Sequence, residues 1–243
     1  MARASRENKV VRPVARTRRP VKAAAERSAG RGRRASGETP YHHGDLHEAL
    51  LQAAERVLER DGLAGLTLRA VAREAGVSHA APTHHFGDLT GLLSELAAIG
   101  FRMFNVAMVA ARGSETQHLM RAMATAKAYI AYAQAHPGMY SLMFRNERID
   151  MTRPSLHEAA TASFQGLANS VGAGGASGEG LEALSLDQAA MIARNWSLVH
   201  GFTTLLLDGR LGDILHRLPA GTTPEQLLEA MMRAAVAPRP PAA

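Results

Sequence analysis

The sequence predicts an all-α protein, because of its composition and because of the spacing and boundaries of its apolar residues. Alanine occurs 46 times, whereas only 5% of the chain is aromatic. Alanine favours helices, and strands are enriched in β-branched and aromatic residues. Apolar residues recur at steps of three and four, which is the period of one helix face. No strand pattern and no internal repeat stands out.

The first helix is predicted from Asp45 to about Asp61. Asp45 and Glu48 fit a capping box at its start, and Gly62 follows its end, where a left-handed residue is needed. A fourth helix is expected near Asp88. Further helices are predicted at about 115–135, 138–145, 154–171, 186–208 and 223–236. The glycine-rich stretch 172–180 is predicted to be a loop.

Two short helices are predicted on either side of Gly76, and their features favour a helix-turn-helix. Thr67 would cap the first of them, Leu68–Ala75, and Ser78 would cap the second, which ends near Phe86. Ala72 is small where the helices must cross, and Gly76 tolerates positive φ at the turn. An ordinary helical hairpin in a bundle is the alternative.

The stretch Leu50–Leu93 resembles the N-terminal domain of TetR/AcrR-type transcriptional regulators. The matching pieces are Asp61-Gly62, the run from Leu66 to Ser78, and His84-His85-Phe86. The resemblance implies an all-helical fold with a DNA-binding head, a ligand-binding and dimerising body, and repression relieved by a small molecule. The segments 41–46 and Trp196–Gly201 are similar to a subgroup named for a Trp-His-Gly motif.

The candidate DNA-binding residues follow from the helix-turn-helix and from this resemblance. His79 and Thr83 are the expected base contacts, and Ser78 and His84 the expected phosphate contacts. The family usually has a tyrosine where this chain has Thr83, and a lysine where it has Leu89. The full candidate set is Thr67, Arg69, Ser78, His79, Ala80, Thr83, His84 and His85.

The charge of the chain is concentrated at its start. Residues 1–36 hold 12 Lys and Arg against two acids, whereas the head, residues 37–94, holds four arginines against eight acids. Blocks of like charge stay disordered and suit nucleic-acid phosphates. We therefore expect a basic arm that compensates for a weakly binding head, with a solubilising extension as the alternative. The candidate phosphate contacts in the arm are Arg16, Arg18, Arg19, Arg31, Arg33 and Arg34.

Four segments are predicted in this order. A disordered basic arm (1–40) precedes a helix-turn-helix DNA-binding domain (41–90). A helical ligand-binding and dimerisation domain (91–237) follows, and a short tail (238–243) ends the chain.

A ligand cavity is predicted between the fourth helix and the helix that carries Trp196 and His200. These two residues are four apart and therefore share a helix face. Core packing of the pair, with the imidazole bonded to a carbonyl, is the alternative. The candidate lining residues are Met103, Phe104, Ala107, Tyr132, Met139, Phe144, Trp196 and His200.

The resemblance, together with the apolar faces of the last two long helices, predicts a homodimer that forms through helices 186–208 and 223–236. The first of these has apolar residues away from the Trp196 face, which would need a second partner. The candidate interface residues are Ile192, Val199, Phe202 and Leu206.

Several function classes are excluded or disfavoured. The chain has no cysteine, which excludes disulfides and thiolate metal sites. His42, His43 and His47 lack convincing partners for a metal, so no cofactor is expected. No catalytic motif is present, and no stretch of 18 uncharged apolar residues could cross a membrane. We expect a cytoplasmic regulator that binds double-stranded operator DNA and a small-molecule effector. A constitutive DNA-binding protein, or a helical enzyme or sequestering protein, is the alternative.

Overall fold

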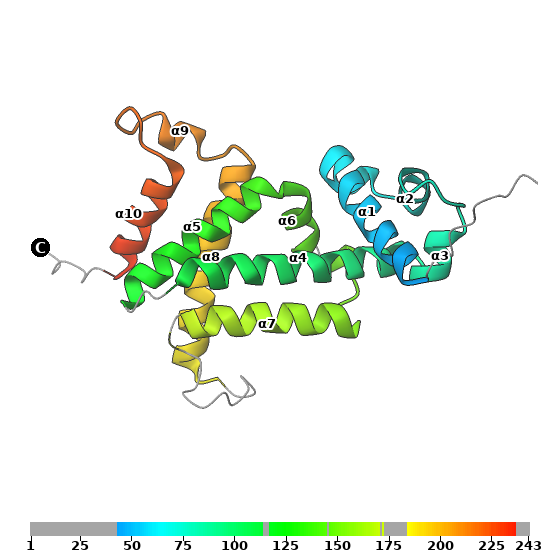
Figure 1. Ribbon diagram of the computed structural model, residues 1–243. Helices are drawn as coiled ribbons and strands as arrows, with labels where there is room; N and C mark the ends of the chain where they lie inside the picture. Colours follow the sequence, from blue (N-terminus) through cyan, green and yellow to red (C-terminus); the bar gives the residue numbers. More distant parts are fainter. Residues whose placement is uncertain (1–42, 114–116, 145, 171, 173–183, 237–243) are drawn as a thin grey trace, which may run out of the picture. The chain divides into compact units, whose positions relative to one another are not determined.

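The computed structural model describes residues 43–113, 117–144, 146–170, 172 and 184–236, and these are helical apart from turns and short links. Figure 1 shows the arrangement of the helices. The head contains α1 (His43–Gly65), α2 (Leu68–Glu74) and α3 (Ala81–Phe86). The remaining helices are α4 (Leu89–Arg112), α5 (His118–Ala135), α6 (Pro137–Met143), α7 (Pro154–Ser170), α8 (Leu186–Leu207), α9 (Gly212–Leu215) and α10 (Pro224–Val236).

The all-α prediction is confirmed for the described residues. The helix ends show which of the predicted caps and helix-ending glycines are present. Asp88 caps α4, since its carboxylate accepts from the Gly91 amide at 2.8 Å. Gly62 has φ 68° and interrupts α1 where a left-handed residue was expected. The first helix starts at His43 and not at Asp45, so the predicted capping box at Asp45 is wrong. The sequence also gave no sign of α9 or of the 3-10 turn Asn146–Arg148.

Helix α4 holds the fold together. Leu92, Leu96 and Ala97 on α4 are fully buried. They belong to one hydrophobic cluster that runs from Leu50 on α1 to Ala159 on α7. The head and the body therefore share a single core, and burial of this apolar surface stabilises both of them.

Two close approaches bring further helices onto this core. A Cβ at Gly100 on α4 would lie 2.7 Å from Met139 on α6. A Cβ at Gly138, also on α6, would lie 3.0 Å from the Leu58 carbonyl oxygen on α1. Glycine at these positions lets α6 pack tightly against both α4 and α1.

Helix α7 lies alongside α4 and runs in the same direction (Figure 1). Asn105 on α4 donates to the Ala159 carbonyl, and Arg112, further along α4, donates to the Gly166 carbonyl, further along α7. The two helices therefore stay in register over most of their length.

Helices α5, α8 and α10 share a second, smaller core. Ile130 from α5, Phe202 from α8 and Leu228 from α10 meet in it. On its rim Lys127 of α5 forms an ion pair with Glu229 of α10. The C-terminal helix is thus fixed to the body by both apolar and charged contacts.

Among the described residues one helix, α4, has the length and apolar composition of a membrane-spanning segment. More than half of its apolar window is buried inside the fold, as expected for the central helix of a core, so this is weak evidence for a membrane.

Several predictions concern residues outside the described ranges. They are the basic arm with its six candidate arginines, the position of His42, the glycine-rich stretch 173–180 and the tail 238–243.

Candidate DNA-binding and ligand-binding sites

The turn between α2 and α3 has the backbone of a helix-turn-helix. Thr67 caps α2 as predicted, since its hydroxyl accepts from the Ala70 amide at 3.1 Å. Gly76 has φ 69°, and the next amide, that of Val77, donates back to the Ala72 carbonyl at 3.0 Å. Ala72 is completely buried. A small residue at this position lets the chain fold back closely after α2.

The start of α3 differs from the prediction that Ser78 caps it. The helix begins at Ala81, whose amide donates to the Ser78 carbonyl and not to its hydroxyl. Pro82 lies in the first turn and has no amide to be capped. Ser78 therefore belongs to the turn that precedes the helix.

The candidate DNA-contacting residues are predominantly on the outside of the head. The exposed ones are Thr67, Arg69, Ser78, His79, Ala80, Thr83 and His84. His85 is partly buried, and its ring lies 6.0 Å from that of His47 on α1. Phe86, the last residue of α3, is buried and lies 4.8 Å from the same His47 ring. The Phe86 side of α3 is thus held by α1, and its other side is accessible.

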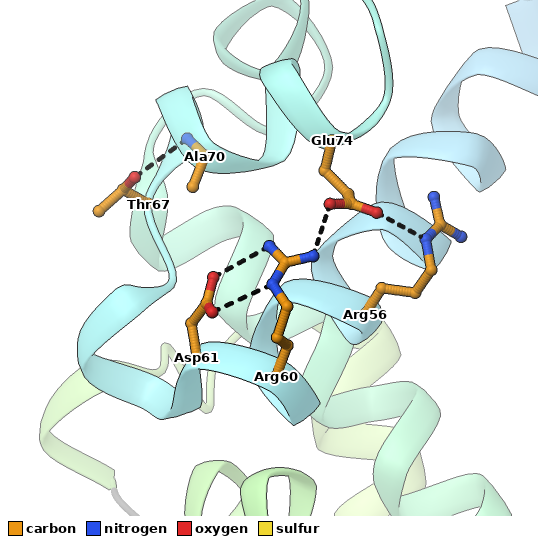
Figure 2. Close-up of polar contacts among 6 residues, drawn as sticks. All are labelled: Arg56, Arg60, Asp61, Thr67, Ala70 and Glu74. Carbon is orange, nitrogen blue, oxygen red and sulfur yellow. Dashed lines mark hydrogen bonds and ion pairs between the residues drawn. The ribbon is translucent and has the colours of Figure 1, made fainter.

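A charged network joins α2 to α1 on the flank of the head (Figure 2). Glu74 accepts from Arg56 Nε at 3.0 Å and from Arg60 Nη1 at 2.9 Å. Arg60 also forms a two-pronged contact with Asp61. These hydrogen bonds lower the pKa of Glu74, with Arg60 the larger cause and Arg56 the next.

This network determines which basic groups of the head are available. The charges of Arg56 and Arg60 are compensated by Glu74 and Asp61, so they offer little to a phosphate. Arg69 and Arg73 are the two remaining arginines of the head, and both are exposed. The head therefore has a small basic surface for its size.

A cavity of about 740 Å³ lies in the body between α4, α5, α7 and α8. Ligand sites in proteins have volumes of this order. Its walls combine aromatic, aliphatic and a few polar side chains. The lining residues are Phe101, Phe104, Asn105, Met108, Val109, Arg112, Thr125, Tyr129, Met143, Phe144, Met151, Ala160, Ala162, Ser163, Phe164, Gly166, Leu167, Ser170, Trp196, Ser197 and His200.

Four of the eight predicted lining residues border this cavity. They are Phe104, Phe144, Trp196 and His200. The other four, Met103, Ala107, Tyr132 and Met139, lie elsewhere in the main core. Tyr132, for example, donates to the Gly100 carbonyl at 3.0 Å.

The sequence prediction missed the wall formed by α7, including Phe164 and Leu167. The apolar positions of this helix were visible in the sequence, but nothing indicated which neighbour they would face.

His200 lies at the centre of an aromatic cluster at one end of the cavity. The hydroxyls of Tyr129 and Tyr140 both lie 2.9 Å from its Nδ1. The Phe144 and Trp196 rings lie 4.7 and 6.1 Å from the imidazole. A neutral imidazole nitrogen has one lone pair, so only one of the two hydroxyls can donate to it at a time.

The environment of this cluster favours its uncharged forms. Burial lowers the pKa of His200 below 6.5 and raises the pKa of Tyr129 and of Tyr140. The end of the cavity near His200 is therefore neutral at pH 7.

The predicted dimer-interface residues mostly contact the chain's own interior. Ile192 and Phe202 are each only 3% exposed, and Phe202 packs in the second core. Val199 and Leu206 are partly buried against the same core. The apolar residues that α8 does expose include Met191 and Leu205. The burial of Ile192 and Phe202 means that they have no surface to offer a second copy.

These features define a helix-turn-helix DNA-binding protein with a helical, cavity-containing body. Residues 50–96 match the model of the family described as "Bacterial regulatory proteins, tetR family". Residues 120–235 match the model described as "Tetracyclin repressor-like, C-terminal domain". The chain belongs to the TetR family of transcription regulators, and it is a regulator and not an enzyme. The Trp-His-Gly subgroup stays a prediction.

Solved structures share the fold of this chain. A protein of unknown function from Rhodococcus sp. RHA1 is 35% identical with a TM-score of 0.64, and the match covers 81% of this chain and 96% of that one. The putative regulatory protein SCO4313 is 21% identical with a TM-score of 0.60, over 80% and 97% of the two chains.

A putative TetR family transcription regulator from Shewanella sp. PV-4 is also 21% identical, with a TM-score of 0.53 over 80% and 99%. A comparison with curated proteins found no match.

We predict that Glu74→Gln loosens α2 from α1. The substitution removes the charge that Arg56 and Arg60 share, and the effect should be small because such pairs are screened by water. The thermal unfolding midpoint at pH 7 should fall slightly and should become less sensitive to salt. Glu59→Gln, which removes an exposed carboxylate of α1, is the matched control and should leave the midpoint unchanged.

The same prediction has a pH dependence. The pKa of Glu74 is lowered in the folded protein. The contribution of Glu74 to folding stability is therefore complete above the ordinary pKa of 4.5, and it is lost as the pH falls through the lowered pKa. The difference between wild type and Glu74→Gln should therefore disappear in acid. A difference that grows in acid would contradict this origin.

Proposed function

We propose that this regulator is a repressor that binds a near-palindromic operator as a homodimer and is released by a small-molecule effector. The observation that carries the proposal is that α4 belongs to both sites. It begins beside the exposed helix-turn-helix, and its Phe101–Arg112 segment lines the cavity. The proposal places the protein in the cytoplasm, where an operator would be accessible.

The exposed side of α3 supports recognition in the major groove. His79, Thr83 and His84 are accessible and carry groups that can bond to base edges or phosphates. Two heads related by a two-fold axis would contact half-sites whose centres are about 34–36 Å apart, or a multiple of that.

The packing also supports coupling between the two sites. Helix α4 contacts α3 at its start, and α6 packs against both α4 and α1. A molecule that fills the cavity would favour one position of α4 over another and thereby alter the separation of the heads in the dimer. The free energy by which this molecule can shift DNA binding is limited by the difference between its binding free energies for the two positions of α4.

Dimerisation through α8 and α10 remains part of the proposal, with a revised surface. Leu205 of α8 is 43% exposed and Met231 of α10 is 38% exposed. A Cβ at Gly201 on α8 would meet no atom of another element within 4 Å among the described residues, so another helix could approach there. These residues replace Ile192 and Phe202 as interface candidates.

We predict that Thr83→Ala and His79→Ala each relax sequence preference at one operator position. Duplexes are first selected from a random pool with the wild-type protein, and the variants are then compared on the selected site and on single-base changes. Loss of one base contact should cost about 1–3 kcal/mol at that position. Thr161→Ala, an exposed threonine of α7, is the control and should bind as the wild type does.

Two outcomes would contradict this prediction. Equal weakening on all sequences would assign the side chain to the phosphate backbone. Selection that enriches no sequence would favour a constitutive, non-specific DNA-binding protein.

We predict that Leu205→Glu yields monomers and weakens operator binding. A buried carboxylate in an apolar interface is costly, whereas the same change on a free surface is tolerated. Sedimentation equilibrium gives the mass, and Val106→Glu on α4, at a residue that is 70% exposed, is the control. A Leu205→Glu protein that still sediments as a dimer would remove this face of α8 from the interface.

We predict that deletion of residues 1–36 flattens the salt dependence of DNA binding. These residues carry a net charge of +10, and each phosphate contact contributes about 0.9 to the slope of log K against log salt. The slope should fall by several units while sequence preference survives. An unchanged slope on the same duplex would show that the arm does not contact DNA.

A further inference from the structure

The cavity in the body has an unbalanced charge. Among the described residues, none of the 21 that line it is an aspartate or a glutamate, and Arg112 is the one with a permanent charge. His200, the other basic side chain in the lining, is held neutral by burial. A ligand would therefore meet mostly apolar walls and a single cation.

Several other polar side chains of the lining are already engaged within the chain. Asn105 accepts from the Ser163 hydroxyl at 2.7 Å. The Thr125 hydroxyl donates to the Arg121 carbonyl, and the Ser170 hydroxyl to the Leu167 carbonyl. These groups have less to offer a ligand, because a new contact would compete with one that already exists.

Arg112 differs from them. Its Nη2 donates to the Gly166 carbonyl at 2.6 Å, but its buried Nε has no hydrogen-bond partner among the described residues. Burial, and next the charge of Arg121, lower the pKa of Arg112, and no carboxylate of the described residues opposes these effects. The guanidinium is thus a partly buried cation whose charge the described surroundings do not compensate, and an anion bound beside it would stabilise it.

The shape of the cavity places this cation at one end. The α4 residues that line it run along one helix face from Phe101 to Arg112, a length of about 16 Å at 1.5 Å per residue. Phe104 packs edge-on against Tyr129, next to His200, near the Phe101 end. Met108 and Val109 form the apolar stretch of α4 between the two ends.

We propose that this cavity binds an elongated apolar molecule with an anionic head, such as a carboxylate, and that Arg112 holds the head. The apolar part lies along Met108 and Phe104 toward the His200 cluster. The inference rests on the proposed function, in which the same cavity takes the effector, and it adds the chemical class of that effector.

The test compares two probes of the same chain length, decanoate and decan-1-ol, on the full-length protein. Binding is followed by the fluorescence of Trp196, which is the only tryptophan in the sequence and lines the cavity. Decanoate should bind about tenfold or more tightly than decan-1-ol, as expected for a charge-assisted hydrogen bond.

Three variants locate the source of this preference. Arg112→Gln should lose the preference by weakening decanoate alone, whereas Arg112→Lys should keep part of it. Arg102→Gln removes an exposed arginine of the same helix and should change nothing. Thermal unfolding of each variant establishes that it is folded.

Equal affinity of the two probes for the wild-type protein would overturn the proposal, whatever the variants do. Equal loss of both probes in a folded Arg112→Gln protein would also overturn it, because Arg112 would then act only by joining α4 to α7.

Release of the selected operator is measured separately. Arg112-dependent binding of decanoate without release would support the anion site and contradict its role as the effector site.

Discussion

Helix α4 must bury apolar side chains along nearly its whole length, and most of the structure follows from how this is done. It packs against α1, α3, α5, α6 and α7. The cover is so close at Gly91 that a Cβ there would lie 2.0 Å from the Phe86 carbonyl oxygen. Where the cover is incomplete, beyond Phe101, the helix borders the cavity.

The parts of the fold that local chemistry decides could be predicted from the sequence. Thr67 and Asp88 cap their helices because a short oxygen-bearing side chain can reach an amide three residues on. Glycine occupies positions 62 and 76 because the backbone has positive φ there, and a residue with a Cβ would be strained in that conformation. The prediction that Ser78 caps α3 is wrong because Ser78-His-Ala-Ala forms a turn and the helix begins only at its last residue, Ala81.

The parts that depend on the rotation of one helix against another could not be predicted. The sequence shows that α8 has apolar residues on several sides, but it does not show that α5 and α10 cover Phe202. It likewise gave the correct pair α4 and α8 for the cavity and missed α7, whose partner depends on the long-range contacts of Asn105 and Arg112. Half of the predicted lining was therefore placed on the wrong side of α4 or in the main core.

The contact between α6 and α1 has a consequence for how such a protein can be recombined. Gly138 lies so near the Leu58 carbonyl that α6, though distant in the chain, completes the packing of the first helix. A chimera joined just after α3 would place Leu58 against an α6 from the other parent, and α4 against an α1 and α3 that did not evolve with it. The exposed side of α3, which is the proposed DNA-contacting surface, can therefore be altered without disturbing this packing, whereas exchange of the entire head requires matched partners on α4 and α6.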